Sequence, residues 1–159
     1  MSVPLDDGVP SVATVVGELE AAQAGGASRD ELLKVAVRTI EASGPRYDWV
    51  GIYLLDGDML TLHNYVGRPT EHSRIPVGVG VCGSAVAERR DINVPDVREL
   101  ENYLACSVET RSELVVLISD LESGRIHGQI DLDSDRPAAF TPEDERELKR
   151  VAEWLGRLF

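Results

Sequence analysis

Two strand-turn-strand patterns constrain the fold of this chain more than any other feature. In the first, aromatic and branched residues flank the turn-forming run Asp56-Gly57-Asp58, which is typical of a β-hairpin. In the second, apolar residues flank Glu122-Ser123-Gly124 in the same way. We expect the strands of both hairpins to join in one antiparallel sheet. These predicted strands cover residues 49–55, 60–66, 114–119 and 125–133.

Helical periodicity precedes and follows the strand region. Apolar residues recur at helical spacing over residues 11–24. A second helix is predicted to begin at Ser28, with Glu31 as its partner in a capping box. Thr141 is the expected N-cap of the last helix, and Asp144 follows three residues later. Helices on either side of an antiparallel sheet in the sequence indicate an α+β fold with helices packed on a face of that sheet.

The segment between the hairpins has a different composition. Residues 67–81 hold two prolines and three glycines, which predicts a long loop, and long loops in compact domains are often functional. Shorter elements are expected after it: a helix at 82–90, a strand at 92–94 and a helical turn at 97–103.

The net charge of −12 over 159 residues argues against nucleic acid and membrane partners, because both are bound through Lys and Arg side chains that neutralise phosphates. No apolar run approaches the roughly 20 residues that span a bilayer. The acidic N-terminus lacks the basic-then-apolar pattern of a signal peptide. We therefore expect a cytoplasmic protein with a flexible tail over residues 1–10 and a single domain over 11–159. Its thiols would be kept reduced, and any disulfide would be transient.

The chain has two cysteines, and several carboxylates follow them. Cys82 and Cys106 are 24 positions apart. Asp131 and Asp133 alternate with apolar residues in a predicted strand and so share one face. Glu113 begins the neighbouring strand and can join them. Three carboxylates held close together cannot all ionise without cost, so at least one pKa is expected to rise.

Each of these features also has a purely structural interpretation. A free cysteine is usually a small buried apolar residue, and a pair of acids on one strand face is usually solvated. Trp49 and Tyr53 share a strand face and are either core residues or the aromatic wall of a ligand pocket. The glycine-rich run 78–83 is a poor dinucleotide motif, and its glycines more plausibly let backbone amides approach a ligand carboxylate.

No metal or cofactor is predicted from the sequence. A Cys-x-x-Cys motif is absent, and the histidines have no ligand spacing. We expect each histidine to lie at the surface or to be half-buried. They are His63, His72 and His127.

Taken together, these residues resemble the free methionine-(R)-sulfoxide reductases, a family built on a single GAF domain. The resemblance begins near Arg46 and continues to the C-terminus, and it lies in the joint order and spacing of short motifs. These are 47–55, 74–78, 80–83, 94–97, 105–106, 111–113, 131–134 and 140–144.

The resemblance implies a GAF domain over residues 11–159 and reduction of free L-methionine-(R)-S-oxide to methionine. Cys106 matches the cysteine that attacks the sulfoxide sulfur and becomes a sulfenic acid. Cys82 matches a second family cysteine, which would close a disulfide. The implied partners are free methionine sulfoxide, a thioredoxin-like or small-thiol reductant, and a possible second copy of the chain in a homodimer.

The same resemblance assigns the substrate-binding residues. Glu113, Asp131 and Asp133 match the acids that hold the substrate amine and polarise the sulfoxide oxygen. Trp49 and Tyr53 match the aromatic wall of the pocket.

This sequence also departs from the family pattern. His72 stands where the family usually has the disulfide partner of the attacking thiol. Ser107 and Tyr103 replace a common Asp and His beside that thiol. We expect substrate binding to survive and the resolving step to differ, with either Cys82 or an external thiol taking part.

Two other functions are compatible with the sequence. The first is a non-catalytic GAF sensor for an amino-acid-like ligand, which the missing third cysteine favours. Nucleotide sensing is a poor variant of that idea, because Asn93 lacks the lysine that follows it in cyclic-nucleotide GAF domains. The second is a dimerisation module that uses the apolar stripe of the first helix.

Overall fold

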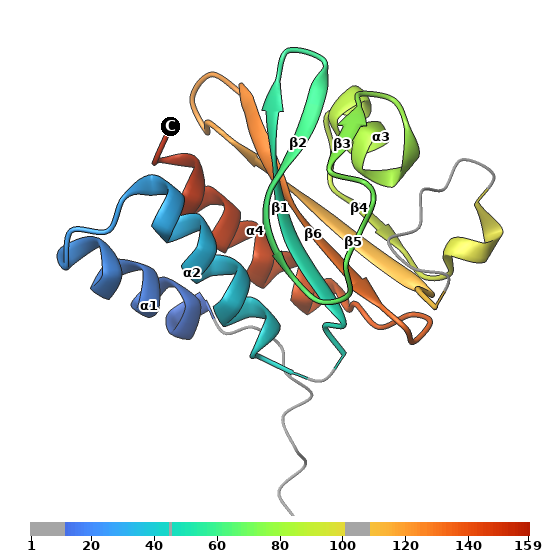
Figure 1. The fold of residues 1–159 in the computed structure, drawn as a ribbon, viewed down its shortest axis with the longest axis horizontal. Helices are drawn as coiled ribbons and strands as arrows, with labels where there is room; N and C mark the ends of the chain where they lie inside the picture. The colour runs from blue at the N-terminus through green and yellow to red at the C-terminus, as the bar shows by residue number, and fades with distance from the viewer. Residues whose placement is uncertain (1–11, 45, 101–108) are drawn as a thin grey trace, which may run out of the picture.

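The computed structural model describes residues 12–44, 46–100 and 109–159. Within these residues the strands form one six-stranded sheet in the order β3-β2-β1-β6-β5-β4 (Figure 1), and every neighbouring pair is antiparallel. The strands are β1 (Trp49–Asp56), β2 (Met59–Val66), β3 (Arg74–Pro76), β4 (Ile92–Val94), β5 (Ser112–Ser119) and β6 (Ile126–Ser134).

Both predicted hairpins are confirmed. β1 pairs with β2 and β5 pairs with β6, and their ends lie within two residues of the predicted bounds. Each turn contains a glycine in the left-handed region, Gly57 with φ +62° and Gly124 with φ +73°, which L side chains rarely adopt. The central pair of the sheet, β1 with β6, joins the two hairpins. The α+β class with one antiparallel sheet is confirmed.

Three helices cover one face of the sheet. The helix α2 (Arg29–Glu41) packs on β1 and β2, and α4 (Pro142–Gly156) packs on β5 and β6. The helix α1 (Val12–Ala24) packs against both of these helices (Figure 1). The sheet contributes alternate side chains to this core, as the period of two in a strand requires. They are Val50, Ile52, Leu114, Val116, Ile118, Ile130 and Leu132.

The predicted caps begin the helices. The Ser28 hydroxyl accepts a hydrogen bond from the Glu31 N–H at 3.2 Å. Thr141 and Asp144 form the reciprocal capping box of α4. These bonds satisfy backbone donors that have no partner inside the first helical turn.

Asp144 is also the centre of a buried polar network. Its Oδ1 accepts from Arg46 Nη2 at 2.7 Å and from the Tyr47 hydroxyl at 3.1 Å. The Asp144 side chain is fully buried and that of Arg46 is 8% exposed, so each charge depends on the other for compensation. The network attaches the segment before β1 to the start of α4.

The other face of the sheet carries a second core under α3 (Gly80–Glu88). This helix contacts β3, β5 and β6, on the side away from α1 (Figure 1). Helices therefore cover both faces of the sheet, although unequally. The expected packing of helices on a face of the sheet is confirmed, and α3 adds a helix on the opposite face.

The predicted loop at 67–81 contains regular structure at both its centre and its end. β3 pairs with β2 and buries Ile75. Three residues with one inward side chain are too short to show an alternating pattern. α3 begins at Gly80, two residues before the predicted start. Its N-cap Val79 makes no side-chain hydrogen bond, so the sequence holds no capping signal from which this start could be predicted.

Some predictions concern residues that the structure describes only in part or not at all. The expected turn at 97–103 is a short 3-10 helix at Val97–Glu99, and residues 101–103 lie outside the described part. The predicted tail at 1–10 and Cys106 also lie outside it. In the described residues, none of the helices has both the length and the apolar character needed to cross a membrane.

Candidate active site

Three carboxylates gather on the sheet face that α3 covers. Glu113 of β5 stands directly opposite Asp133 of β6, while Asp131 stands between Gly51 of β1 and Val115 of β5. The exposed fractions are 3% for Glu113 and 1% for each aspartate. The structure therefore rules out a solvated face and confirms that Glu113 joins the two aspartates.

The helix α3 brings Cys82 to these acids. The Cys82 Sγ lies 3.8 Å from Glu113 Oε2, to which the thiol donates. The side-chain amide of Gln129 donates to the Cys82 carbonyl at 3.0 Å and so attaches the first turn of α3 to β6. Gly83 permits the close approach, since a Cβ there would lie 2.5 Å from the Pro76 carbonyl oxygen.

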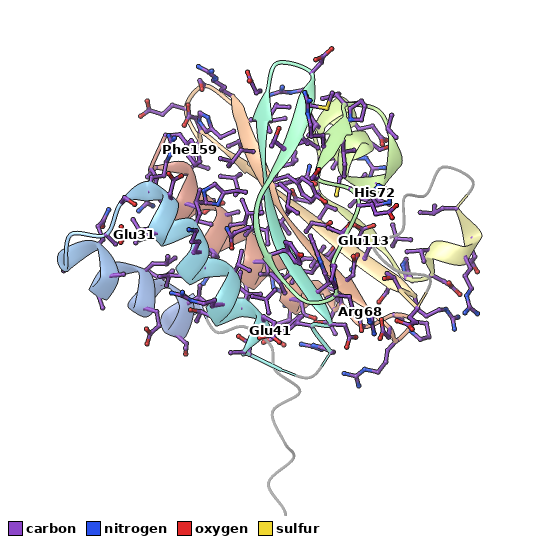
Figure 2. All side chains as sticks on the ribbon, viewed as in Figure 1. Glu31, Glu41, Arg68, His72, Glu113 and Phe159 are labelled. Atoms are coloured by element: carbon purple, nitrogen blue, oxygen red, sulfur yellow. The ribbon has the colours of Figure 1, made fainter. Side chains whose placement is uncertain are left out.

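A small cavity lies where these groups meet. It has about 10 Å³ of space for the centre of a water-sized sphere, which is room for roughly one water molecule or ion. Glu113 on the sheet and His72 in the β2–β3 connection both lie toward α3, away from α1 (Figure 2). The described residues that line the cavity are Tyr53, His72, Ile75, Val79, Gly80, Val81, Cys82, Glu113 and Asp131.

The two candidate aromatic residues occupy different places. Tyr53 lines the cavity, and its hydroxyl donates to the His72 carbonyl at 2.7 Å. Trp49 is buried beside it, with ring centroids 6.4 Å apart, and stacks on Tyr65 at 5.5 Å. A Cβ at Gly51 would lie 2.3 Å from the Trp49 ring, so glycine at position 51 makes room for the indole.

The environment favours the neutral forms of the clustered groups. Burial raises the pKa of Glu113 well above its usual range, and the charges of Asp131 and Asp133 raise it further. Burial also raises the pKa of Asp131, partly offset by hydrogen bonds from Glu113 and Cys82. Both carboxyls therefore favour the protonated form more than an exposed acid does, as expected for acids held close together.

The thiol of Cys82 is likewise held in its neutral form. Burial raises its pKa well above the ordinary value, and the charges of Asp131 and Glu113 add to the effect. Because the thiolate is the nucleophilic form, Cys82 is poorly suited to attack before the charges around it change.

Several oxygens of the cluster lack a conventional partner. Among the described residues, no hydrogen-bond donor reaches Glu113 Oε1, Asp131 Oδ1 or Gln129 Oε1. A buried polar atom without a partner is rare and calls for an explanation. An acidic cavity with unused acceptors is suited to a cationic or proton-rich ligand.

Two contributors to this site were not predicted as functional. Gln129 is two residues before Asp131 and so belongs to the same strand face, a signal that was available from the alternation alone. His72 lies in the loop whose length indicated a functional role, and the resemblance placed it where the family has a cysteine; the structure shows that it lines the cavity. Cys106 lies outside the described residues, so its distance from the acids is still a matter of prediction.

Comparison with known proteins identifies a domain family and a related enzyme. The profile of the GAF domain matches residues 28–158. The chain is 36% identical over 111 residues to the free methionine-R-sulfoxide reductase of Escherichia coli strain K12, which covers 70% of this chain and 66%, just under two thirds, of that protein.

Two solved structures extend the similarity. One is a type II free methionine-R-sulfoxide reductase from Thermoplasma acidophilum, with 36% identity, a TM-score of 0.75, and coverage of 88% of this chain and 93% of that one. The other is a free methionine-R-sulfoxide reductase from Neisseria meningitidis in complex with its substrate, with 30% identity, a TM-score of 0.86, and coverage of 100% and 94%.

Proposed function

The chain belongs to the GAF domain family and, within it, to the free methionine-R-sulfoxide reductases, and from this premise we propose that it reduces free L-methionine-(R)-S-oxide to methionine. The observation that carries the proposal is the buried cluster of Cys82, Glu113 and Asp131 around one cavity. A carboxylic acid that stays neutral near pH 7 can donate a proton to an oxygen, and an ionised neighbour can bind an ammonium group.

In the first chemical step, the Cys106 thiolate attacks the sulfoxide sulfur. Glu113 donates its proton to the sulfoxide oxygen. The S–O bond of the substrate breaks, and the protonated oxygen is transferred to the Cys106 sulfur. Methionine leaves, Cys106 becomes a sulfenic acid and Glu113 becomes a carboxylate. The raised pKa of Cys82 supports this division of roles, because a buried neutral thiol is a weak first nucleophile.

In the second step, Cys82 resolves the sulfenic acid. The contact from Cys82 Sγ to Glu113 Oε2 gives the thiol proton a path to the newly ionised Glu113. The Cys82 thiolate then attacks the Cys106 sulfur and a disulfide forms. The departing hydroxyl group takes this proton from Glu113 and leaves as water, and Glu113 is protonated again from solvent before the next turnover. A dithiol reductant, thioredoxin-like or small, takes over the disulfide and restores both thiols.

Substrate entry requires the cavity to widen, since its present volume suits a single water molecule. The outer wall is formed by His72 and by Val79, which is 37% exposed. Both belong to connections on either side of β3. We therefore place the opening movement in these connections.

The test is turnover of free methionine-(R)-sulfoxide, the free S epimer and a peptide that contains methionine sulfoxide, with thioredoxin or dithiothreitol as reductant. We expect activity on the free R epimer only. Cys106→Ser should abolish it, while Cys82→Ser should allow one turnover per enzyme and then slow regeneration by thioredoxin. Glu122→Gln, at an exposed position in the β5–β6 turn, is the matched control and should behave as wild type.

Full activity in Cys106→Ser would refute the mechanism. Tight binding of the sulfoxide without consumption of thiol would refute the proposed reductase activity and favour a non-catalytic sensor of an amino-acid-like ligand.

A further inference from the structure

We propose that the same cavity binds one thiophilic divalent cation, such as Zn²⁺, through the Cys82 sulfur and the carboxylates of Glu113 and Asp131. The binding of metal does not depend on the reductase activity. Its consequence for the enzyme, a block of the substrate cavity, rests on the proposed function.

The first argument is the arrangement of ligand atoms. One atom from each of Cys82, Glu113 and Asp131 lies within 4.8 Å of the other two, and the sulfur lies 3.8 Å from Glu113 Oε2. A tetrahedral Zn²⁺ with ordinary bond lengths separates its sulfur and oxygen ligands by about 3.6 Å. Small side-chain rotations therefore bring all three groups within bonding distance of one ion.

The second argument is the shape and charge of the cavity. Its volume suits a single ion or water molecule. The described lining residues include no Lys or Arg, and Asp133 is buried next to Glu113 across the sheet. A cation there meets no Lys or Arg charge from these residues, and a water can supply a fourth ligand.

The third argument is the unused bonding capacity. The Glu113 Oε1 and Asp131 Oδ1 atoms are buried, and no described donor reaches them. Glu113 is 3% exposed and Asp131 is 1% exposed. Both residues line the cavity. A metal ion would use lone pairs that the protein leaves without a donor.

The ligands come from three separate elements, α3, β5 and β6. Their positions in the sequence have no metal-binding spacing, which is why the sequence predicted no metal. From the sequence we therefore expected no metal site, and the proposed site departs from that expectation. The site inferred here is an open three-ligand site that competes with the reaction, because an ion bound to Cys82 and Glu113 removes the resolving thiol and the proton donor together.

Cobalt offers a direct test, because a thiolate bound to Co²⁺ gives a sulfur-to-metal charge-transfer band in the near ultraviolet and histidine or carboxylate sites do not. The titration uses the reduced full chain with Cys106→Ser, so that Cys82 is the only thiol present. We expect the band to saturate at one Co²⁺ per chain and Zn²⁺ to remove it by displacement. Glu113→Gln and Asp131→Asn should each weaken Co²⁺ binding by about tenfold or more, since even loss of an outer-shell partner costs that much.

A control variant and three outcomes decide whether the metal site exists. Glu122→Gln in the same Cys106→Ser background should bind Co²⁺ as tightly as its parent. Absence of the band, its persistence after Cys82→Ser, or unchanged affinity in Glu113→Gln would each overturn the metal site. Because the readout is spectroscopic, it holds whether or not the chain reduces any sulfoxide.

Discussion

Replacing Glu113 with Gln should make the folded protein more stable at neutral and alkaline pH. The buried carboxyl retains its proton after folding, whereas the same group in the unfolded chain loses it near pH 4.3. The folded state therefore binds more protons than the unfolded state above that pH. Under proton linkage the free energy of unfolding falls as pH rises through this window, until the folded group also ionises.

The magnitude follows from one proton. Each group that stays protonated only in the folded state contributes a slope of about 1.4 kcal/mol per pH unit at most. Glutamine keeps the shape of the side chain and cannot ionise, so Glu113→Gln should remove up to that slope. The gain in stability over wild type should be near zero at pH 4 and should grow steadily toward pH 8.

Urea unfolding at pH 5, 6, 7 and 8, with a chelator present, measures this difference directly. The exposed Glu122→Gln variant should keep the wild-type slope. Groups remote from position 113 titrate alike in both proteins and cancel when wild type and variant are subtracted, whereas Asp131 and Cys82, whose pKa values depend on Glu113, contribute to the difference. If the two curves ran parallel, or if Glu113→Gln lost stability relative to wild type toward pH 8, the account of a proton-holding acid cluster would be wrong.

Three further changes test the surrounding structure. Gly51→Ala should destabilise the protein by about 1–3 kcal/mol in urea unfolding, because its Cβ would overlap the Trp49 ring; a neutral effect would mean that the indole can move aside. Asp144→Asn should cost about 3–5 kcal/mol, since it leaves the buried Arg46 charge without its partner, and a loss below 1 kcal/mol would show that water reaches the pair. Tyr53→Phe should cost about 1 kcal/mol through the lost hydrogen bond to the β2–β3 connection. It should also raise the KM for the free sulfoxide without changing kcat, and equal changes in both parameters would argue against a positioning role.

The alternating pattern of β6 was enough to predict which of its side chains share a face. Asp131 and Asp133 were placed together, and Ile130 and Leu132 opposite them, because the period of a strand is two. The hairpin also made it possible for Glu113 to join the aspartates. Their burial was not predictable, since it depends on α3 covering that face, and exposed acids are the usual outcome.

The contact between Cys82 and Glu113 could not be predicted from the sequence. The cysteine reaches Glu113 because Gln129 holds the first turn of α3 and Gly83 allows it to approach the segment after β3. The first is a contact between residues 47 positions apart, and the second is a close approach of two nearby backbone segments that no apolar periodicity predicts. β3 was not predicted because only Ile75 of its three residues is buried, and one buried residue shows no alternating pattern.

The carboxylates of β6 lie on one face of the strand and the core residues Ile130 and Leu132 on the other, so the site depends on the register of β6 against β1. A slip of one residue against β1 would move the carboxylates into the aliphatic core and the aliphatic side chains into the cavity. Gly128 resists such a slip, because any larger residue at its place would collide with the Tyr53 carbonyl oxygen, 2.2 Å from a built Cβ. Inserting one residue within β6 should thus destroy chemistry and folding together, whereas inserting it at Glu122–Gly124 should spare both.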